Sequence, residues 1–225
     1  MKHIPFTLQS KNKLTHDVYE LVFTVPESIE VQPGQFVMFV LPKSGLKRAY
    51  SIAHTDGQTF TFIIKQIDGG LGSTEICSLE TGENIIGMVP LGHFVLQDTP
   101  SPKLFIGTGT GFAPLYAMIR ALEESQSGVK SHFIFGVREQ KDSFYLEELQ
   151  RIQKKYPTFS FDISLSRENI PGFAHGYVTD FLQNPEVVRQ FSEFYLCGSP
   201  AMVQDTRAKL EELGILKEQV FFEQY

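Results

Sequence analysis

Residues 107–114 read Gly-Thr-Gly-Thr-Gly-Phe-Ala-Pro. The run Leu104–Gly107 has the length and apolar character of a buried strand, and Ala113–Glu124 has the composition of a helix. A glycine-rich turn between a strand and a helix lets backbone N–H groups approach a phosphate. This context favours a nucleotide-phosphate loop over a simple turn. It is not the usual dinucleotide fingerprint, because Phe112 replaces the third glycine of Gly-x-Gly-x-x-Gly.

Outward from this loop, strand-like and helix-like segments alternate through the C-terminal half of the chain. The expected strands are Leu104–Gly107, His132–Gly136, Phe159–Leu165, Phe194–Cys197 and Gln219–Phe222. The expected helices are Ala113–Glu124, Tyr145–Tyr156, a shorter one from Val178, and Ala201–Leu213. This alternation predicts a parallel sheet covered by helices on both faces. In such sheets, ligands bind beyond the carboxyl ends of the strands.

The N-terminal half consists of short β-rich runs separated by Gly and Pro, which predicts an antiparallel barrel or sandwich. The expected strands are Phe6–Leu8, Val18–Val25, Gln35–Val40, Arg48–Ala53, Thr59–Lys65, Asn84–Val89 and His93–Leu96. One short helix is expected at Leu71–Leu79. Residues 98–102, Asp-Thr-Pro-Ser-Pro, have the composition of a linker. We therefore predict one domain at residues 1–98 and a second at 99–225.

Bulk composition excludes several classes of protein. The apolar runs are strand-sized and too short for a bilayer, and Met1–Pro5 lacks the apolar segment of a signal peptide. Two cysteines, Cys77 and Cys197, make no disulfide framework, so a cytoplasmic location is expected. A net charge of −6 argues against a nucleic-acid partner. The six histidines show no metal-ligand spacing, so no metal site is expected.

A second place with potential chemistry is Arg48-Ala49-Tyr50-Ser51, within an expected strand. A guanidinium can bind a diphosphate with two parallel hydrogen bonds. Tyr50 can lie against an aromatic ring system, and the Ser51 hydroxyl can donate to a heteroatom. Taken alone, however, Arg-x-Tyr on a strand is more often a solvated edge pair.

Two further glycine-containing turns complete the set. Lys65 is followed at residues 69–74 by Gly-Gly-Leu-Gly-Ser-Thr, where free N–H groups and two hydroxyls suit an anion. A hairpin turn with a Ser or Thr cap is the alternative. Residues 197–203 read Cys-Gly-Ser-Pro-Ala-Met-Val, at another strand-to-helix junction. This junction is expected at the same edge of the sheet as residues 107–114.

In order and spacing, these motifs resemble those of the ferredoxin–NADP reductase superfamily. Phe135-Gly136-Val137-Arg138 and Tyr145-Leu146-Glu147-Glu148-Leu149 also look like its second βα unit, so the resemblance covers essentially the whole chain. It implies a six-stranded antiparallel Greek-key β-barrel that binds FAD. A Rossmann-like α/β domain with a parallel sheet, which binds NADPH or NADH as substrate, is expected to follow.

In the barrel, the resemblance assigns a role to each part of the strand motif. Arg48 would bind the FAD diphosphate, Tyr50 would lie along the flavin, and Ser51 would hydrogen-bond near N5, the hydride acceptor. Ser73 and Thr74 would bind the FAD phosphates at the start of the short helix. The full set of expected FAD contacts in this half is Arg48, Ala49, Tyr50, Ser51, Ile64, Lys65, Gly70, Gly72, Ser73 and Thr74.

In the α/β domain, the resemblance places the nicotinamide nucleotide on the glycine-rich loop, with Cys197 and Gly198 beside the nicotinamide. The loop residues expected to bind its diphosphate are Gly107, Thr108, Gly109, Thr110, Gly111 and Pro114. Ser166 and Arg167 follow an expected strand at the position of the adenosine ribose, where they would hold a 2′-phosphate. We therefore expect NADPH to be preferred over NADH. The alternative is a solvated Arg167 at the start of a loop.

The chain ends in Phe221-Phe222-Glu223-Gln224-Tyr225, which resembles the Glu-x-Tyr terminus of plant-type members. The resemblance implies that Tyr225 is a movable cover over the flavin and that Glu223 orients the nicotinamide or relays a proton. The alternative is a frayed terminus. Together with Ser51 and Cys197, these two residues are the candidate catalytic residues.

Two separate phosphate-binding elements in the barrel, Arg48 and Gly70–Thr74, favour FAD over FMN. Relatives with a fused plant-type iron–sulfur domain need four Cys ligands, and this chain has two cysteines. Electrons are therefore expected to pass to an external acceptor such as ferredoxin, flavodoxin or an oxygenase component. Two alternatives remain open: a reductase of free flavin, and an electron-transfer subunit with little activity alone.

Overall fold

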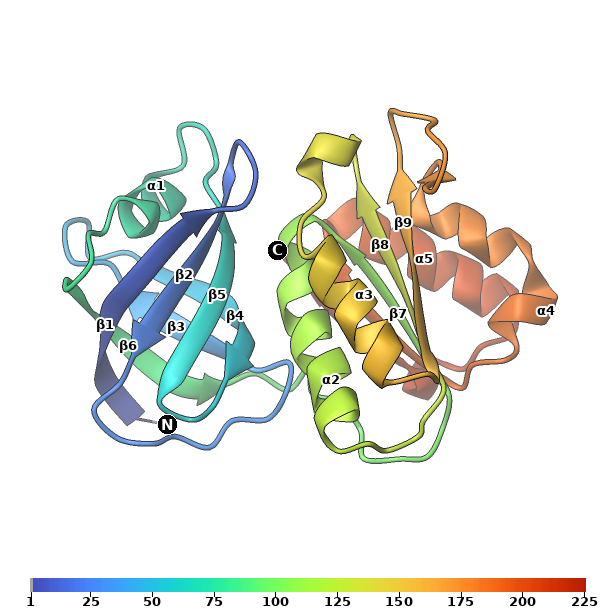
Figure 1. The fold of residues 1–225 in the computed structure, drawn as a ribbon, viewed down its shortest axis with the longest axis horizontal. Coiled ribbons are helices and arrows are strands. Elements are labelled where there is room, and N and C mark those ends of the chain that lie inside the picture. Colours follow the sequence, from blue (N-terminus) through green and yellow to red (C-terminus); the bar gives the residue numbers. More distant parts are fainter. Residues whose placement is uncertain (1) are drawn as a thin grey trace.

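The computed structural model describes residues 2–225 and contains two units that lie side by side (Figure 1). Six antiparallel strands close a barrel in the order β1-β2-β5-β4-β3-β6, which confirms the predicted barrel. The strands are β1 Lys2–Lys13, β2 Val18–Thr24, β3 Phe36–Val40, β4 Lys47–Thr55, β5 Thr59–Lys65 and β6 Asn84–Leu91. A short helix, α1 Leu71–Cys77, connects β5 to β6.

The barrel closes around an aromatic core because apolar residues alternate along its strands. Their rings meet mostly edge to face, the arrangement that aromatic quadrupoles favour. The core phenylalanines, all fully buried, are Phe6, Phe23, Phe39, Phe60 and Phe62.

The second unit is a six-stranded sheet in the order β10-β9-β8-β7-β11-β12, and its neighbouring strands are parallel, as predicted. Its strands are β7 Lys103–Thr108, β8 Ser131–Val137, β9 Phe159–Leu165, β10 Ala174–His175, β11 Glu193–Gly198 and β12 Val220–Gln224. Its helices are α2 Phe112–Glu124, α3 Leu146–Lys155, α4 Pro185–Val188 and α5 Pro200–Glu212. In Figure 1, α2 and α3 cover one face of the sheet and α5 covers the other.

One sequence prediction of local structure is wrong. His93–Leu96 forms no strand, because the chain leaves the barrel there and the Phe94 side chain joins the core of the second unit. The segment from Val178 is helical, as expected, but it is interrupted. It forms a 3-10 helix, Val178–Gln183, and then the single turn α4, since Pro185 cannot continue the hydrogen-bond pattern of a preceding helix.

The two units share a continuous apolar contact. Ala53 of β4 and Ile63 of β5 belong to the same buried cluster as Phe112 and Met118 of α2. The connection between the units is also anchored, since the Tyr195 hydroxyl accepts the backbone N–H of Gln97 at 3.0 Å. These contacts hold strands β4 and β5 of the barrel against α2. None of the helices within residues 2–225 combines the length and apolar character that crossing a bilayer requires.

Candidate functional site

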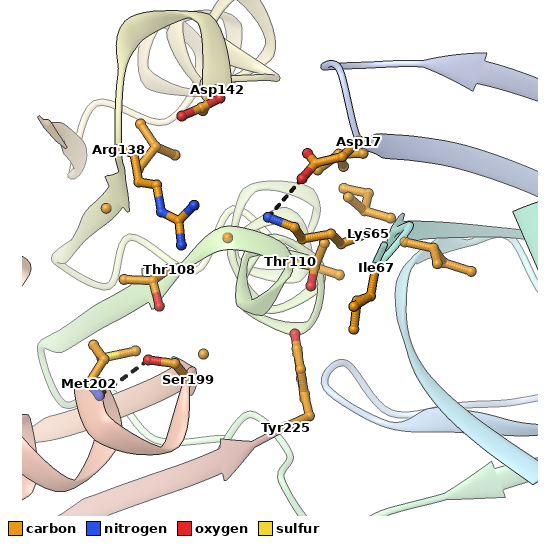
Figure 2. A pocket seen from close by; sticks show the side chains of 18 of the residues that line it. Asp17, Lys65, Ile67, Thr108, Thr110, Arg138, Asp142, Ser199, Met202 and Tyr225 are labelled. Carbon is orange, nitrogen blue, oxygen red and sulfur yellow. Dashed lines mark hydrogen bonds and ion pairs between the residues drawn. The ribbon is translucent and has the colours of Figure 1, made fainter. Parts of the chain in front are cut away.

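A cavity of about 910 Å³ lies between the barrel and the α/β unit. It is lined on one side by β4, β5 and the start of α1, and on the other by the residues that follow β7, β8 and β11. Figure 2 shows side chains from both units converging on this space. The volume is within the range of ligand cavities that bind cofactors.

Residues 48–51 all line the cavity. Arg48 extends over the first turn of α1: a side chain on Gly72 would place its Cβ 2.8 Å from Arg48 Nε. Tyr50 packs against Phe39 in the barrel core, and burial raises the pKa of its phenol to about 12. Tyr50 is therefore neutral at physiological pH, and Arg48 supplies a positive charge on this wall.

The adjoining strand, β5, contributes Ile64, which is buried, and Lys65, which is exposed. Both residues also line the cavity. The Lys65 ammonium lies 2.9 Å from Asp17 Oδ2, a contact drawn in Figure 2. Burial acts to raise the pKa of Asp17, but the hydrogen bond and charge of Lys65 outweigh it and lower the pKa below its usual value. Lys65 is thus held at the cavity wall by a carboxylate from the β1–β2 turn.

The glycine turn before α1 is only partly turned toward the cavity. Gly70, Gly72 and Ser73 line it, whereas Thr74 is exposed and borders a separate depression. The Ser73 hydroxyl accepts the backbone N–H of Ile67 at 2.9 Å and lies 3.3 Å from the Gly70 carbonyl. Ser73 therefore also closes the turn itself.

The glycine-rich loop 107–114 divides in the same way. Thr108, Gly109 and Thr110 line the cavity, and the position of a Cβ on Gly109 has no atom within 4 Å. Pro114, Gly107 and Gly111 do not belong to the lining. A Cβ on Gly111 would lie 2.1 Å from the Cys197 carbonyl oxygen, so this glycine permits close packing of the loop against β11.

Cys197 is fully buried beneath the cavity, while the following Gly198 and Ser199 line it. Burial raises the pKa of the Cys197 thiol well above its usual value, so the thiol is protonated at neutral pH. Ser199 caps α5 by accepting the backbone N–H of Met202 at 3.3 Å. This junction therefore lies at the same sheet edge as loop 107–114, as expected.

The C-terminal residues reach back to the barrel. The Ser51 hydroxyl donates to Glu223 Oε2 at 3.0 Å across the junction of the two units. Burial raises the pKa of Glu223, and the hydrogen bond from Ser51 partly opposes this effect. The Tyr225 side chain points into the cavity beside Thr110 and remains half exposed (Figure 2).

Of the residues expected to hold a 2′-phosphate, Ser166 lines the cavity and Arg167 does not. Arg138 does line it, and its guanidinium points inward in Figure 2. Our site prediction did not include Arg138, although it follows a parallel strand, β8. The same rule that drew attention to the ends of β7 and β11 would have identified it.

These residues fit an FAD. A planar ring system and a diphosphate need an aromatic surface, a cationic group and close backbone approach, and the barrel wall of the cavity offers Tyr50, Arg48 and the glycine turn at Gly70 and Gly72. Within residues 2–225, no group of three or more His, Cys, Asp or Glu side chains is arranged to hold a metal ion.

Two family models match the chain: an oxidoreductase FAD-binding domain at residues 5–96 and an oxidoreductase NAD-binding domain at residues 105–208. The chain is 30% identical to the toluate 1,2-dioxygenase electron transfer component of Pseudomonas putida over 86% of its own length, and spans 58% of that relative. It superposes on the cytochrome P450 reductase GcoB of Amycolatopsis with a TM-score of 0.92 and 26% identity, covering 99% of this chain and 69% of that one.

A third relative, the ferredoxin–NADP reductase B of Sorangium cellulosum, is 33% identical to this chain. The match covers 86% of the chain and 85% of the relative, so it includes both units of the fold. The chain belongs to the ferredoxin–NADP reductase superfamily of flavoprotein oxidoreductases, whose FAD-binding and NAD-binding domains correspond to its barrel and its α/β unit.

Proposed function

We propose that this protein is an NAD(P)H-dependent FAD reductase that passes electrons to a separate redox protein. The observation that carries the proposal is the single cavity lined by both a barrel strand and a glycine-rich strand–helix loop. FAD, when bound, supplies the chemistry by accepting a hydride from a reduced nicotinamide and releasing its electrons singly. The residues of the chain bind the FAD and the nicotinamide nucleotide, orient them, and shield the flavin from water.

On the barrel wall, we assign Arg48 to the FAD diphosphate and Tyr50 to the flat ring system. The guanidinium carries a permanent charge and lies over the glycine turn of α1, so a diphosphate can contact both elements. This arrangement favours FAD over FMN, which has one phosphate. Ala49, Ile64 and Lys65 would complete this wall. Thr74, which lies outside the cavity, has less support than Ser73.

On the α/β wall, Thr108–Thr110 would bind the diphosphate of the nicotinamide nucleotide. Gly109 supports this, because nothing obstructs the space where its side chain would be. We assign the 2′-phosphate of NADPH to Ser166 and Arg138, with Arg167 as a weaker contributor from outside the cavity lining. A bidentate guanidinium contact of this kind favours NADPH over NADH.

At the junction of the two walls, Ser51 and Glu223 form a hydrogen-bonded pair that can orient the reacting groups or move a proton. Tyr225 would cover the flavin face until a nicotinamide displaces it, because a planar phenol shields a ring from water at little entropic cost. Cys197 would support the nicotinamide site from below as a neutral thiol.

We propose an iron–sulfur or similar redox protein as the electron acceptor. The relatives that support this include an oxygenase electron transfer component and a ferredoxin–NADP reductase. We keep the domain boundary between residues 98 and 99, which falls between the two family matches. Two free, buried cysteines suit a cytoplasmic location, where thiols remain reduced.

An absorbance spectrum of the purified protein, followed by NADH and NADPH titrations, tests the proposal. A yellow protein that bleaches on addition of NADPH supports it, and chromatography of the released cofactor should identify FAD. A colourless protein that oxidises NADPH only with added flavin would instead indicate a free-flavin reductase. A yellow protein that neither nucleotide bleaches would indicate a subunit that depends on its complex.

A further inference from the structure

A hydrogen bond outside the cofactor cavity joins the two units. The Tyr145 hydroxyl, at the start of α3, donates to Glu20 Oε2 on barrel strand β2. Burial and this hydrogen bond raise the pKa of Tyr145, so the phenol keeps the proton that it donates. On the barrel, the Asn12 side-chain amide donates to the other oxygen of the same carboxylate at 2.9 Å. The Glu20 carboxylate is therefore held by one hydrogen bond from each unit.

The backbone of Tyr145 has a conformation that residues other than glycine rarely adopt. Its φ of +60° and ψ of 19° lie in the left-handed region. Within residues 2–225, the only other non-glycine residue with a positive φ is Gln126, which is exposed in a turn. Because this conformation costs energy, the contacts around Tyr145 must hold it in place. The preceding residue, Phe144, lines the cavity, while the Tyr145 hydroxyl reaches the barrel.

The Tyr145 ring packs beside the glycine-rich loop of the α/β unit. Its centre lies 5.5 Å from that of Phe112, the residue directly after Gly111 and the first of α2. It lies 5.1 Å from the ring centre of Tyr116, one helical turn later. Tyr145 therefore connects strand β2 of the barrel to the end of the loop that we assign to the nucleotide diphosphate.

A second contact between the units lies near the first. His16 Nδ1, in the β1–β2 turn, is 3.6 Å from Asp142 Oδ1, and both residues line the cavity. Figure 2 shows Asp142 and Asp17, the neighbour of His16, on facing sides of the cavity. In the barrel, β5 lies between β2 and β4. The contacts of β2 and the Ser51–Glu223 hydrogen bond of β4 therefore join the units on both sides of β5.

We propose that Tyr145 and Glu20 are positioning residues for hydride transfer. Together with the Ser51–Glu223 pair, their hydrogen bond sets the angle between the two units. This angle decides how closely a nicotinamide on the α/β wall approaches a flavin on the barrel wall. The apolar contact between the barrel and α2 has no preferred direction, whereas hydrogen bonds are directional. This inference rests on the proposed function and adds two residues that lie outside the cavity lining.

Stopped-flow absorbance tests the proposal by following reduction of FAD-loaded protein by saturating NADPH in the absence of oxygen. Tyr145→Phe and Glu20→Ala each remove one partner of the hydrogen bond and should slow flavin reduction about tenfold, because small misplacements of reacting groups are costly. Glu20→Gln keeps an acceptor oxygen and should retain a rate within about threefold of the wild type. The double variant Tyr145→Phe/Glu20→Ala should be no slower than either single variant, because both changes remove the same interaction.

Two further measurements do not depend on turnover. In the slow variants, the affinity of the apoprotein for FAD should stay within about twofold of the wild type, because Tyr145 and Glu20 lie outside the cavity lining. The long-wavelength absorbance that a nicotinamide stacked on the flavin gives should weaken. In the apoprotein, hydrogen exchange of barrel residues 14–20 should rise several-fold in Tyr145→Phe, although the substitution lies in the other unit.

Tyr156→Phe is the matched control. The Tyr156 hydroxyl donates to the Val129 carbonyl, so the substitution also removes a tyrosine hydroxyl from a hydrogen bond, but within the α/β unit. It should leave flavin reduction within about twofold of the wild type. Retention of FAD absorbance shows that each variant is folded. If Tyr145→Phe does not fold, Glu20→Ala is used alone, since Glu20 is only half-buried on its strand.

Flavin reduction at the wild-type rate in either Tyr145→Phe or Glu20→Ala would overturn the positioning role. So would a Tyr156→Phe variant as slow as Tyr145→Phe, a Glu20→Gln variant as slow as Glu20→Ala, or a double variant in which the two effects multiply. Failure of the proposed function is a separate result: neither NADPH nor NADH would then reduce the FAD-loaded wild type. Hydrogen exchange of residues 14–20 in the apoprotein would still measure the contact between the units, and unchanged exchange in Tyr145→Phe would overturn it.

Discussion

The two walls of the cofactor cavity are built differently. On the barrel wall, the consecutive residues 48–51 all line the cavity. On the α/β wall, loop 107–114 is divided: Thr108–Thr110 line the cavity, while Gly107 and Gly111 are required for packing against neighbouring elements. A repeated glycine in a phosphate loop therefore need not contact the ligand. Some of these glycines are there so that the loop can approach the sheet.

The largest effect is expected for Gly111→Ala, which tests whether this glycine is required for packing. Its Cβ would lie 2.1 Å from the Cys197 carbonyl oxygen, a backbone atom that cannot rotate away. We expect the free energy of unfolding to fall by about 3 kcal/mol, measured by urea denaturation.

Gly109→Ala is the matched control in the same loop. Its φ of +55° disfavours alanine, but no atom obstructs the Cβ, so the expected loss is about 1 kcal/mol. An equal loss in the two variants would show that loop 107–114 is uniform and that Gly111 has no special packing role.

Replacing the arginine on each wall in turn tests which ligand each wall binds. Arg48→Ala should weaken FAD binding by about 1–3 kcal/mol, and Arg138→Ala should weaken NADPH binding by a similar amount while sparing NADH. Calorimetric titrations of apoprotein with FAD, and of FAD-loaded protein with each nucleotide, measure these effects. Arg167→Ala should have the smaller effect on NADPH. If it exceeds Arg138→Ala, the 2′-phosphate site lies at Arg167 instead.

The residue between the walls is tested by Tyr225→Ser. If Tyr225 covers the flavin, its loss should shift the flavin spectrum and let the oxidised nucleotide bind several-fold more tightly, on the order of 1 kcal/mol, because its competitor is gone. Phe222→Ser removes an exposed aromatic ring three residues earlier and serves as the control for a general effect on the terminus. An unchanged spectrum and unchanged affinity in Tyr225→Ser would rule out the cover.

The smallest expected effect concerns the pair that joins the walls. Because the pKa of Glu223 is raised above its ordinary value of 4.5, folding favours the protonated form. This contribution to stability is complete below pH 4.5 and is lost as the pH rises through the raised pKa. Glu223→Gln should remove that loss and so gain stability relative to the wild type as the pH increases. Thermal unfolding between pH 4 and 8 measures this difference, and a constant difference would contradict the shift.

Ser51→Ala provides the complementary measurement. Its hydroxyl donates to the carboxylate and so favours the charged form of Glu223. Removing it should raise the pKa of Glu223 further and extend the loss of stability to higher pH. An identical pH dependence in Ser51→Ala and the wild type would mean that the hydrogen bond does not influence Glu223.

Local patterns in the sequence were sufficient to predict the architecture. Alternating apolar residues predicted most barrel strands, and Phe159–Leu165 forms β9 with the bounds expected. These patterns are readable because side chains alternate in strands and recur every three to four residues in helices. The prediction of a strand at His93–Leu96 was wrong because the burial of this segment comes from the other unit, where Phe94 packs in the α/β core. No local pattern in the sequence identifies which core a residue enters.

For the candidate site, the sequence determined which residues have suitable chemistry and in which order they occur: Arg48-Ala49-Tyr50-Ser51, the glycine turns and the final tyrosine. Only the tertiary structure decided which of them face the cavity. In the folded chain, Ser51 donates a hydrogen bond to Glu223, 172 positions away in the sequence. Arg138 lines the cavity, whereas Arg167 and Thr74 do not. The physical reason is that the cavity lies between two units whose strands are far apart in the sequence. The direction in which a side chain points there depends on how strand ends are packed together, which a spacing along the chain does not encode.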